Sequence, residues 1–219
     1  MPEAILTDDE YLHYLDDLLS GGRSACAAVV ERLLEAKVGL RSIYLDLFQR
    51  SLYDVGTMWE RNQISVGVEH LATAMTESLM ALVYPILFRS TRVNRKAVVA
   101  CTVNEHHQIG GRMVADIFEL HGWDSFFLGA NTPTPDLIDL IGRTDPDIVG
   151  LSLAVRSRLP LLHDAIDRIR AHFPEVRVIV GGQAFRFGGA DGFGERPGVA
   201  CIGSVDELES LIRDETPRA

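Results

Sequence analysis

Glu105, His107 and Gly110 are the residues of this chain whose types and spacing best suit metal chemistry. A neutral imidazole is a good ligand for a transition metal, and its second ring nitrogen usually donates to a carboxylate that fixes its tautomer. Glu105, two positions before His107, is placed to be that carboxylate. Gly110 would let the start of a following helix approach a bulky ligand closely. The spacing therefore predicts a metal ligand with its orienting partner.

The residues on either side of this motif predict where it lies in the fold. The segment 97–103 is continuously apolar and rich in β-branched residues, which is typical of a central parallel strand. The segment 109–120 carries its apolar residues in one helical stripe. The motif thus falls in the loop at the carboxyl end of a strand, which is where open α/β sheets bind ligands.

From Lys96 onward, the chain alternates between strand and helix patterns. The expected strands are 97–103, 125–128, 148–153, 176–180 and 199–202, and the expected helices are 109–121, 134–143, 157–172 and 204–213. This alternation predicts an α/β fold with a doubly wound five-stranded parallel sheet, in the flavodoxin-like order 2-1-3-4-5. The loop that bears His107 would lie at the switch point beside the first strand. Ser204 and Glu207 predict a capping box for the last helix.

Residues 1–93 show helical periodicity instead, and we expect a four-helix bundle that caps the 94–219 domain. The first predicted helix begins near Thr7 and ends at Gly21-Gly22. The other three run over 24–36, 41–61 and 66–89. Thr7 or Asp8 is the expected N-cap, with acidic residues in the first turn. Pro85 should kink the last helix or end its regular part.

Composition excludes several classes of function. The net charge is −10, and the only basic cluster is 92–96, so a nucleic-acid-binding surface is not expected. No stretch approaches the ~20 uninterrupted apolar residues that span a membrane, and nothing resembles a signal peptide. The three cysteines are widely separated and form no C-x-x-C pair, which indicates a reduced, cytoplasmic protein.

Two further landmarks fall at strand ends. Ser152 lies near the end of the third predicted strand, and Gly181-Gly182 follows the fourth. Together with Glu105-x-His107-x-x-Gly110, they make residues 94–215 resemble the cobalamin-binding domain of methionine synthases, corrinoid methyl-carrier proteins and cobalamin photoreceptors. The hallmark of that family is D-x-H-x-x-G, so Glu105 is one methylene longer than the usual residue. Ala154 stands where many members carry leucine.

The resemblance implies that His107 replaces the dimethylbenzimidazole base as the lower axial ligand of cobalt. The displaced nucleotide tail would enter a slot beside the first strand, with room left by Ser152, Gly181 and Gly182. The loop residues His106, Gln108 and Ile109 are expected to lie against the cofactor. His106 is also a competing ligand, but its spacing to Gly110 is four residues rather than three, which favours His107.

The helical half carries a second group of residues. Trp59 is followed nine residues later by Glu69-His70. On its own, this pattern also fits one core tryptophan and an unrelated polar pair. It resembles, however, the signature of light-sensing cobalamin proteins that include the carotenoid repressors. That resemblance implies that Trp59 packs against the adenosyl group of adenosylcobalamin and that Glu69 and His70 contact the group nearby.

Two differences from those repressors affect how a light signal would leave the protein. The chain begins directly at the bundle, so we expect no winged-helix DNA-binding domain and no direct contact with nucleic acid. Glu60 follows Trp59 where some repressors carry a histidine, which argues against a bis-histidine photoproduct. The signal would therefore pass to a separate regulator or effector protein, or through a homo-oligomer.

Three functions are compatible with these residues. The favoured one is a stand-alone light sensor that binds adenosylcobalamin, with methylcobalamin as the other candidate cofactor. The second is the corrinoid methyl-carrier subunit of a methyltransferase, which is the one reading that would make the chain part of an enzyme. The third is an interaction module that binds no cobalamin. Some stand-alone relatives of the photosensors also bind a bilin, but no cysteine here has an evident bilin-attachment context.

Overall fold

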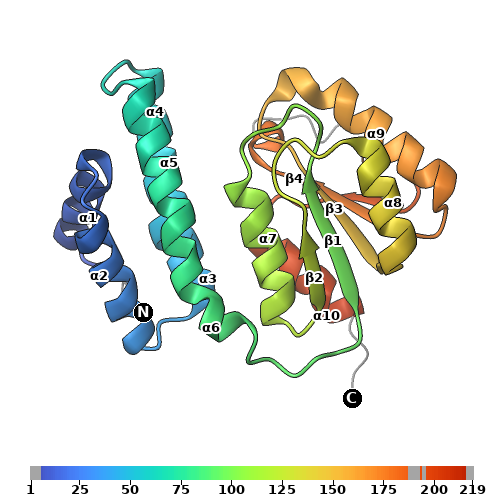
Figure 1. The fold of residues 1–219 in the computed structure, drawn as a ribbon, viewed down its shortest axis with the longest axis horizontal. Coiled ribbons are helices and arrows are strands. Elements are labelled where there is room, and N and C mark those ends of the chain that lie inside the picture. The colour runs from blue at the N-terminus through green and yellow to red at the C-terminus, as the bar shows by residue number, and fades with distance from the viewer. Residues whose placement is uncertain (1–5, 187–192, 194–195, 216–219) are drawn as a thin grey trace. The chain divides into compact units, whose positions relative to one another are not determined.

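The computed structural model describes residues 6–186, Phe193 and residues 196–215. The chain divides into two compact units, Met1–Ile86 and Leu87–Ala219, of which the first is helical and the second is built on a sheet (Figure 1). Across the described ranges, no helix is both long and apolar enough to cross a membrane.

The helical unit consists of four helical segments joined by short turns. Its elements are α1 (Asp8–Ser20), α2 (Arg23–Glu35), α3 (Leu40–Ser42), the π-helix η1 (Ile43–Gln49), α4 (Arg50–Glu60), α5 (Val66–Met80), the 3-10 turn η2 (Ala81–Val83) and α6 (Tyr84–Leu87). Helix α5 packs against α1, α2 and α4, and α1 also packs against α2. The core between them contains large buried side chains, including Tyr14, Leu18, Leu33, Phe48 and Met75. The predicted helical N-terminal region is confirmed.

Helix α1 begins with the predicted cap. The Glu10 N–H donates to Thr7 Oγ1 at 3.2 Å, and the Thr7 N–H donates to Glu10 Oε2 at 2.9 Å, which completes a capping box. Gly21 ends the helix in the left-handed region, with φ of 83°. The choice between Thr7 and Asp8 is therefore settled in favour of Thr7.

The third and fourth segments differ from straight helices. Residues 40–60 are helical throughout, but η1 has the wider π geometry and buries Ile43, Tyr44, Leu47 and Phe48. In the fourth segment, regular α-helix ends at Met80 and continues as η2 and α6. Pro85 explains this ending, because it has no N–H to donate to the carbonyl four residues earlier and its ring crowds that carbonyl.

Within its described residues, the sheet unit has five parallel strands in the order β2-β1-β3-β4-β5, as predicted. The strands are β1 (Lys96–Cys101), β2 (Asp124–Phe127), β3 (Ile148–Ser152), β4 (Arg177–Gly181) and β5 (Val199–Cys201). The helices are α7 (Ile109–Leu120), α8 (Thr134–Thr144), α9 (Leu159–His172) and α10 (Val205–Glu215), with 3-10 turns η3 (Arg156–Arg158) and η4 (Gln183–Phe185).

Helices cover both faces of this sheet (Figure 1). Alternate residues of β1 point to opposite faces, because side chains alternate along a strand. Ala97 and Val99 join the core under α7 and α10, whereas Val98 and Ala100 join the core under α8 and α9. Both faces of β1 are buried, which explains why the segment is apolar without interruption.

The start of α10 corrects one detail of the sequence prediction. The Glu207 N–H donates to Ser204 Oγ at 3.2 Å, as a capping box requires. The Glu207 carboxylate, however, accepts from the Gly203 N–H at 2.8 Å rather than from Ser204. The acidic side chain therefore caps a donor one residue earlier than expected.

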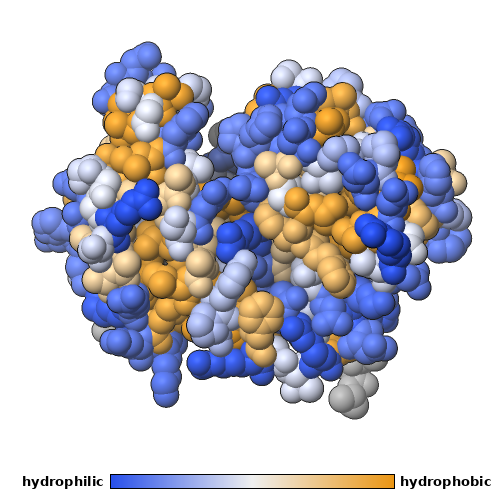
Figure 2. All heavy atoms as spheres, viewed as in Figure 1, coloured by the Kyte–Doolittle hydropathy of each residue, from blue (hydrophilic) through white to orange (hydrophobic). Residues whose placement is uncertain are grey.

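On the face shown in Figure 2, hydrophobic side chains of both units reach the surface among many hydrophilic ones. The large side chains exposed within the described residues are Leu12, Trp59, Val66, Tyr84, Phe88 and Phe126. Trp59, at the end of α4, is thus not a core tryptophan.

Candidate functional site

The carboxyl ends of β1, β3 and β4 bring the predicted site residues of the sheet unit together. Cys101 pairs with Ser152 in the register of β1 and β3, and Ser152 pairs with Gly181 in the register of β3 and β4. Because β2 lies on one side of β1 and β3 on the other, the loop after β1 is at the switch point of the sheet. This loop carries Glu105 and His107.

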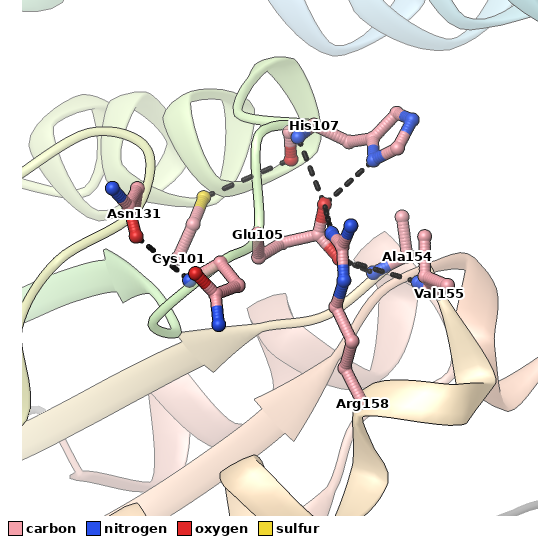
Figure 3. Close-up of polar contacts among 8 residues, drawn as sticks. Cys101, Glu105, His107, Asn131, Ala154, Val155 and Arg158 are labelled. Carbon is pink, nitrogen blue, oxygen red and sulfur yellow. Dashed lines mark hydrogen bonds and ion pairs between the residues drawn. The ribbon is translucent and has the colours of Figure 1, made fainter.

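Glu105 is the most constrained residue of the site. Its side chain is fully buried, and its carboxylate accepts hydrogen bonds on both oxygens (Figure 3). Oε1 accepts from the His107 N–H at 2.9 Å and lies 2.6 Å from His107 Nδ1. Oε2 accepts from the N–H groups of Ala154 at 2.9 Å and Val155 at 3.2 Å. One carboxylate thus connects the loop after β1 to the loop after β3.

These donors keep Glu105 ionised. Burial by itself raises its pKa, but the hydrogen bonds from the His107 ring, the His107 N–H and the Ala154 N–H outweigh burial and lower the pKa to about 2. A permanent anion at Nδ1 favours the His107 tautomer that has its proton there. In that tautomer Nε2 carries the lone pair, and the adjacent carboxylate makes it a better metal ligand.

The His107 side chain itself projects from the protein. It is 61% exposed, although its ring is held at Nδ1 by the buried Glu105. His106 is also exposed, but no hydrogen bond to any described residue orients its ring. An oriented and accessible imidazole is what a metal ligand needs, and this distinction supports His107 over His106.

Hydrogen bonds fix the rest of the loop after β1. The Asn131 N–H donates to the Glu105 carbonyl at 2.7 Å, and the Asn104 N–H donates to Asn131 Oδ1 at 2.7 Å. Gln108 Oε1 accepts from the Ala130 N–H at 3.1 Å. Gln108 therefore holds the loop after β2 against the loop after β1. The next residue, Ile109, begins α7 with its side chain buried.

The glycines of the motif have different surroundings. A Cβ on Gly110 would meet no atom within 4 Å, so the space beside the start of α7 is open. A Cβ on Gly111 would lie within 3.2–3.3 Å of Phe127, Cys101 and Ser152, so this glycine lets α7 pack tightly onto the strand ends. Gly111 stands next to Gly110, but the motif did not single it out.

Gly181 and Gly182 do not simply leave room, as the sequence suggested. A Cβ on Gly181 would lie 3.0 Å from the Ile202 carbonyl oxygen. Gly182 has φ of 115°, and a Cβ there would overlap the backbone of Leu153. The Leu153 N–H donates to the Gly181 carbonyl at 2.9 Å. Gly182 therefore allows the loop after β4 to lie directly against the loop after β3, and it also shapes the site.

Gly182→Ala should lower the free energy of unfolding of the cofactor-free protein by about 2 kcal/mol, because it combines a left-handed φ with a backbone overlap. Gly110→Ala is the matched control. Its Cβ meets nothing, so it should leave stability unchanged or raise it by up to ~1 kcal/mol. Urea unfolding followed by circular dichroism measures both. Equal losses for the two variants would contradict this distinction.

The Cys101 thiol borders the site without being a candidate ligand. Burial raises its pKa to about 12, and Glu105 contributes in the same direction. The thiol therefore stays protonated at neutral pH, whereas metal coordination requires a thiolate. Its sulfur lies 3.7 Å from the His107 carbonyl oxygen and helps to position the loop.

The donor set fits a metal that arrives inside a macrocycle. Within the residues that the structure describes, no group of three or more His, Cys, Asp or Glu side chains could hold a bare metal ion. A single histidine suffices when a ring such as corrin already supplies the equatorial ligands. The buried hydroxyl of Thr102, directly after β1, also makes no hydrogen bond within the described residues. It is available to a polar group of such a cofactor.

The candidates in the helical unit form a second histidine–carboxylate pair. Glu69 and His70 lie in the first turn of α5, where Glu69 Oε2 is 2.6 Å from His70 Nδ1. Thr73 Oγ1 donates to Glu69 Oε1 at 3.1 Å and fixes the carboxylate from the other side. Trp59 is 47% exposed at the end of α4, the helix that packs against α5.

Sequence reasoning missed Arg158, which ends η3. Its Nη1 lies 3.5 Å from Glu105 Oε1, although 53 positions separate the two residues. No short motif links them, and only the pairing of β1 with β3 brings their loops together. From this region the sequence prediction named only Ser152, at the end of β3, and Ala154 in the loop that follows.

Two family models together match most of the chain. Residues 95–212 match a family model described as B12 binding domain, and residues 13–84 match a second model with the same description. The solved monomethylamine corrinoid protein of Methanosarcina barkeri superposes with a TM-score of 0.78 at 15% identity, over 95% of this chain and 100% of that chain. At this level of identity, the likeness concerns the fold.

Curated relatives with sequence similarity include two transcriptional repressors and a corrinoid protein. The HTH-type transcriptional repressor CarA of Myxococcus xanthus is 36% identical over 57% of this chain and 43% of its own length, and CarH of the same organism is 29% identical over 72% and 52%. Dimethylamine corrinoid protein 1 of Methanosarcina acetivorans is 26% identical over 59% and 62%. The chain thus spans about half the length of the two repressors. Because the first family model alone covers residues 95–212 of 219, this protein belongs to the B12-binding domain family.

Proposed function

We propose that this protein is a cobalamin-dependent light sensor. In this proposal, adenosylcobalamin is bound with its own dimethylbenzimidazole displaced, His107 Nε2 is the lower axial ligand, and the helical unit covers the opposite face of the corrin. The similarity to the repressors CarA and CarH supports it. The single observation that carries it is the oriented Glu69–His70 pair in a helical unit that also exposes Trp59.

On the lower face, the chain would supply a preformed ligand. Glu105 is already ionised and already fixes the His107 ring, so cofactor binding needs no reorganisation of this pair. Ser152 and Thr102 would offer hydroxyl groups to the displaced nucleotide tail. The residues that the sequence placed against the cofactor, His106, Gln108 and Ile109, belong to the same loop.

On the upper face, Trp59 would supply a large aromatic surface. A tryptophan that served only the core would be buried, whereas nearly half of this side chain is exposed. Such a surface suits packing against the adenine ring of an adenosyl group. His70, with its ring oriented by Glu69, would offer a hydrogen bond to the same group.

When bound, adenosylcobalamin supplies a cobalt–carbon bond that visible light can break. Trp59 would then lose its packing partner, and the helical unit would change its arrangement. We propose that a separate regulator or effector protein, or a second copy of this chain, detects that change. The three cysteines are free thiols, which fits the proposed cytoplasmic location.

An absorption spectrum tests the proposal directly. The protein is reconstituted with adenosylcobalamin in the dark and measured before and after green light. We expect a change that free adenosylcobalamin does not reproduce, together with a change in oligomeric state or partner binding. A spectrum and an assembly state that both stay as they were in the dark would contradict light sensing.

Trp59→Ala is the informative variant for this test. Trp59 lies in the helical unit, so the dark spectrum that reports His107 ligation should remain. The rate of the light response, or the preference for adenosyl over methyl as upper group, should change by about 10-fold, the size expected when one aromatic packing partner is lost. If Trp59→Ala matches the wild type in the rate of the light response and in the preference for the upper group, Trp59 does not contact the upper face of the cofactor.

A corrinoid methyl-carrier is the second candidate function. The similarity to dimethylamine corrinoid protein 1 favours it, because that relative matches 133 residues at 26% identity. The same Glu105–His107 pair would serve, and the helical unit would protect methylcobalamin between transfers. This candidate predicts methyl transfer with a partner methyltransferase and no preference for adenosylcobalamin.

A further inference from the structure

Among the described residues, Arg158 is the only one besides His107 that forms an ion pair with the Glu105 carboxylate. It ends the turn η3, and its side chain reaches from there to Glu105 (Figure 3). Nη1 lies 3.5 Å from Glu105 Oε1, and the side chain is 31% exposed. This is an ion pair between a half-buried guanidinium and a fully buried carboxylate.

The pair cannot become a good hydrogen bond, because Glu105 has no acceptor site left. A carboxylate offers about four lone-pair sites. Two are used by the N–H and ring of His107, and two by the N–H groups of Ala154 and Val155. Arg158 Nη1 accordingly makes no hydrogen bond within the described residues, although that atom is buried.

A buried donor without an acceptor is costly, so its position suggests a partner that arrives from outside the chain. Its charge is already balanced by Glu105, so an incoming acceptor does not need to carry a full negative charge. The neighbouring His107 would place the lower face of a corrinoid at this loop. Two oxygen acceptors occur on that side of the cofactor, namely the carbonyls of the corrin amide side chains and the phosphodiester of the nucleotide tail.

We propose that Arg158 is a cofactor-binding residue whose Nη1 donates to an oxygen acceptor on the lower side of the corrinoid. The proposal rests on the proposed role of His107 as lower ligand but not on light sensing. Arg158 would then have two functions in one position. It balances the charge of the carboxylate that orients the metal ligand, and it directly recognises the molecule that carries the metal.

The test is a dark titration of cofactor-free protein with adenosylcobalamin and with adenosylcobinamide, which keeps the corrin amides but lacks the nucleotide tail. Arg158→Gln should weaken adenosylcobalamin binding about 10-fold, the size expected when one charged donor is lost. Arg156→Gln is the matched control, because it removes the same charge from an exposed position of the same turn. It should leave both affinities within about 2-fold.

The two ligands identify the acceptor. An equal loss of affinity for both supports a corrin amide, and a loss for adenosylcobalamin alone supports the phosphodiester. Wild-type affinity of Arg158→Gln for both ligands would overturn the proposal. If wild-type protein binds neither ligand, the proposed role of His107 fails instead.

Thermal unfolding of the cofactor-free proteins separates binding from a structural role. Within the described residues, Arg158 Nη1 makes no hydrogen bond and its ion pair with Glu105 is long at 3.5 Å, so Arg158→Gln should unfold within about 2 °C of the wild type. A much larger decrease, matched by the loss of affinity, would assign Arg158 to stability and overturn the proposal. Arg158→Met, which keeps the apolar stem, is the second variant if the glutamine protein does not fold.

Discussion

His107→Ala should lower the dark affinity for adenosylcobalamin by at least ~100-fold, because it removes the ligand itself, whereas the loss of an orienting partner costs ~10- to 100-fold. The protein that still binds at high cofactor concentration should show the spectrum of a cobalt with water as lower ligand. Among the described residues of the loop after β1, His107 is the only histidine whose ring is held by a hydrogen bond. Absorption spectroscopy during the titration reports both quantities.

The same variant should leave the fold nearly intact. The His107 side chain is 61% exposed, so its removal leaves no cavity, but it takes one of four donors from the buried Glu105 carboxylate and should lower the free energy of unfolding by about 1 kcal/mol. His106→Ala is the control, since it removes the adjacent, unoriented imidazole. It should bind with wild-type spectrum and affinity. A wild-type spectrum for His107→Ala, or a water-ligated spectrum for His106→Ala, would show that His107 is not the lower ligand of the cobalt.

The sheet unit could be predicted from sequence because its signals are local and strong. The segment at β1 is buried on both faces, so it is apolar without alternation and identifies a central strand. Once the alternation of strands and helices is fixed, handedness and short connections leave few strand orders. The motif around His107 then falls at the switch point, and the position of the site follows from topology.

The details that the sequence could not predict depend on contacts between distant segments. The apolar spacing of residues 40–55 suits an α-helix and the π geometry of η1 equally well. The partners of Glu105 in the loop after β3 are backbone N–H groups, and every non-proline residue has one. Gly182 looked like a source of space, but only the structure shows that Leu153 fills it.

Glu105→Gln should produce the largest loss of stability of any single change at this site, about 3 kcal/mol, because it replaces a fully buried carboxylate that is held by four donors with a neutral amide that has only one oxygen. The amide is nearly the same size, so no cavity forms. Its NH2 group, however, must replace one of the two oxygens. If the NH2 group faces His107, it meets two donors of that residue, and if it faces Ala154 and Val155, it meets two backbone N–H groups. In either orientation the NH2 group faces N–H donors, so those hydrogen bonds are lost.

The substitution should therefore lower stability more than His107→Ala does, and it should also weaken binding. Affinity for adenosylcobalamin should fall ~10- to 100-fold, since the ring of the metal ligand loses its fixed tautomer. Glu105→Asp is the second variant, because the family resemblance places aspartate at this position. The shorter carboxylate should keep the contacts to His107 and lose those to Ala154 and Val155. Relative to Glu105→Gln, Glu105→Asp should therefore regain more of the affinity for adenosylcobalamin than of the stability. Urea unfolding and dark titrations of all three variants measure this separation. If Glu105→Gln were as stable as the wild type, the carboxylate would not be the residue that joins the two loops, and the fixed orientation of His107 would need another cause.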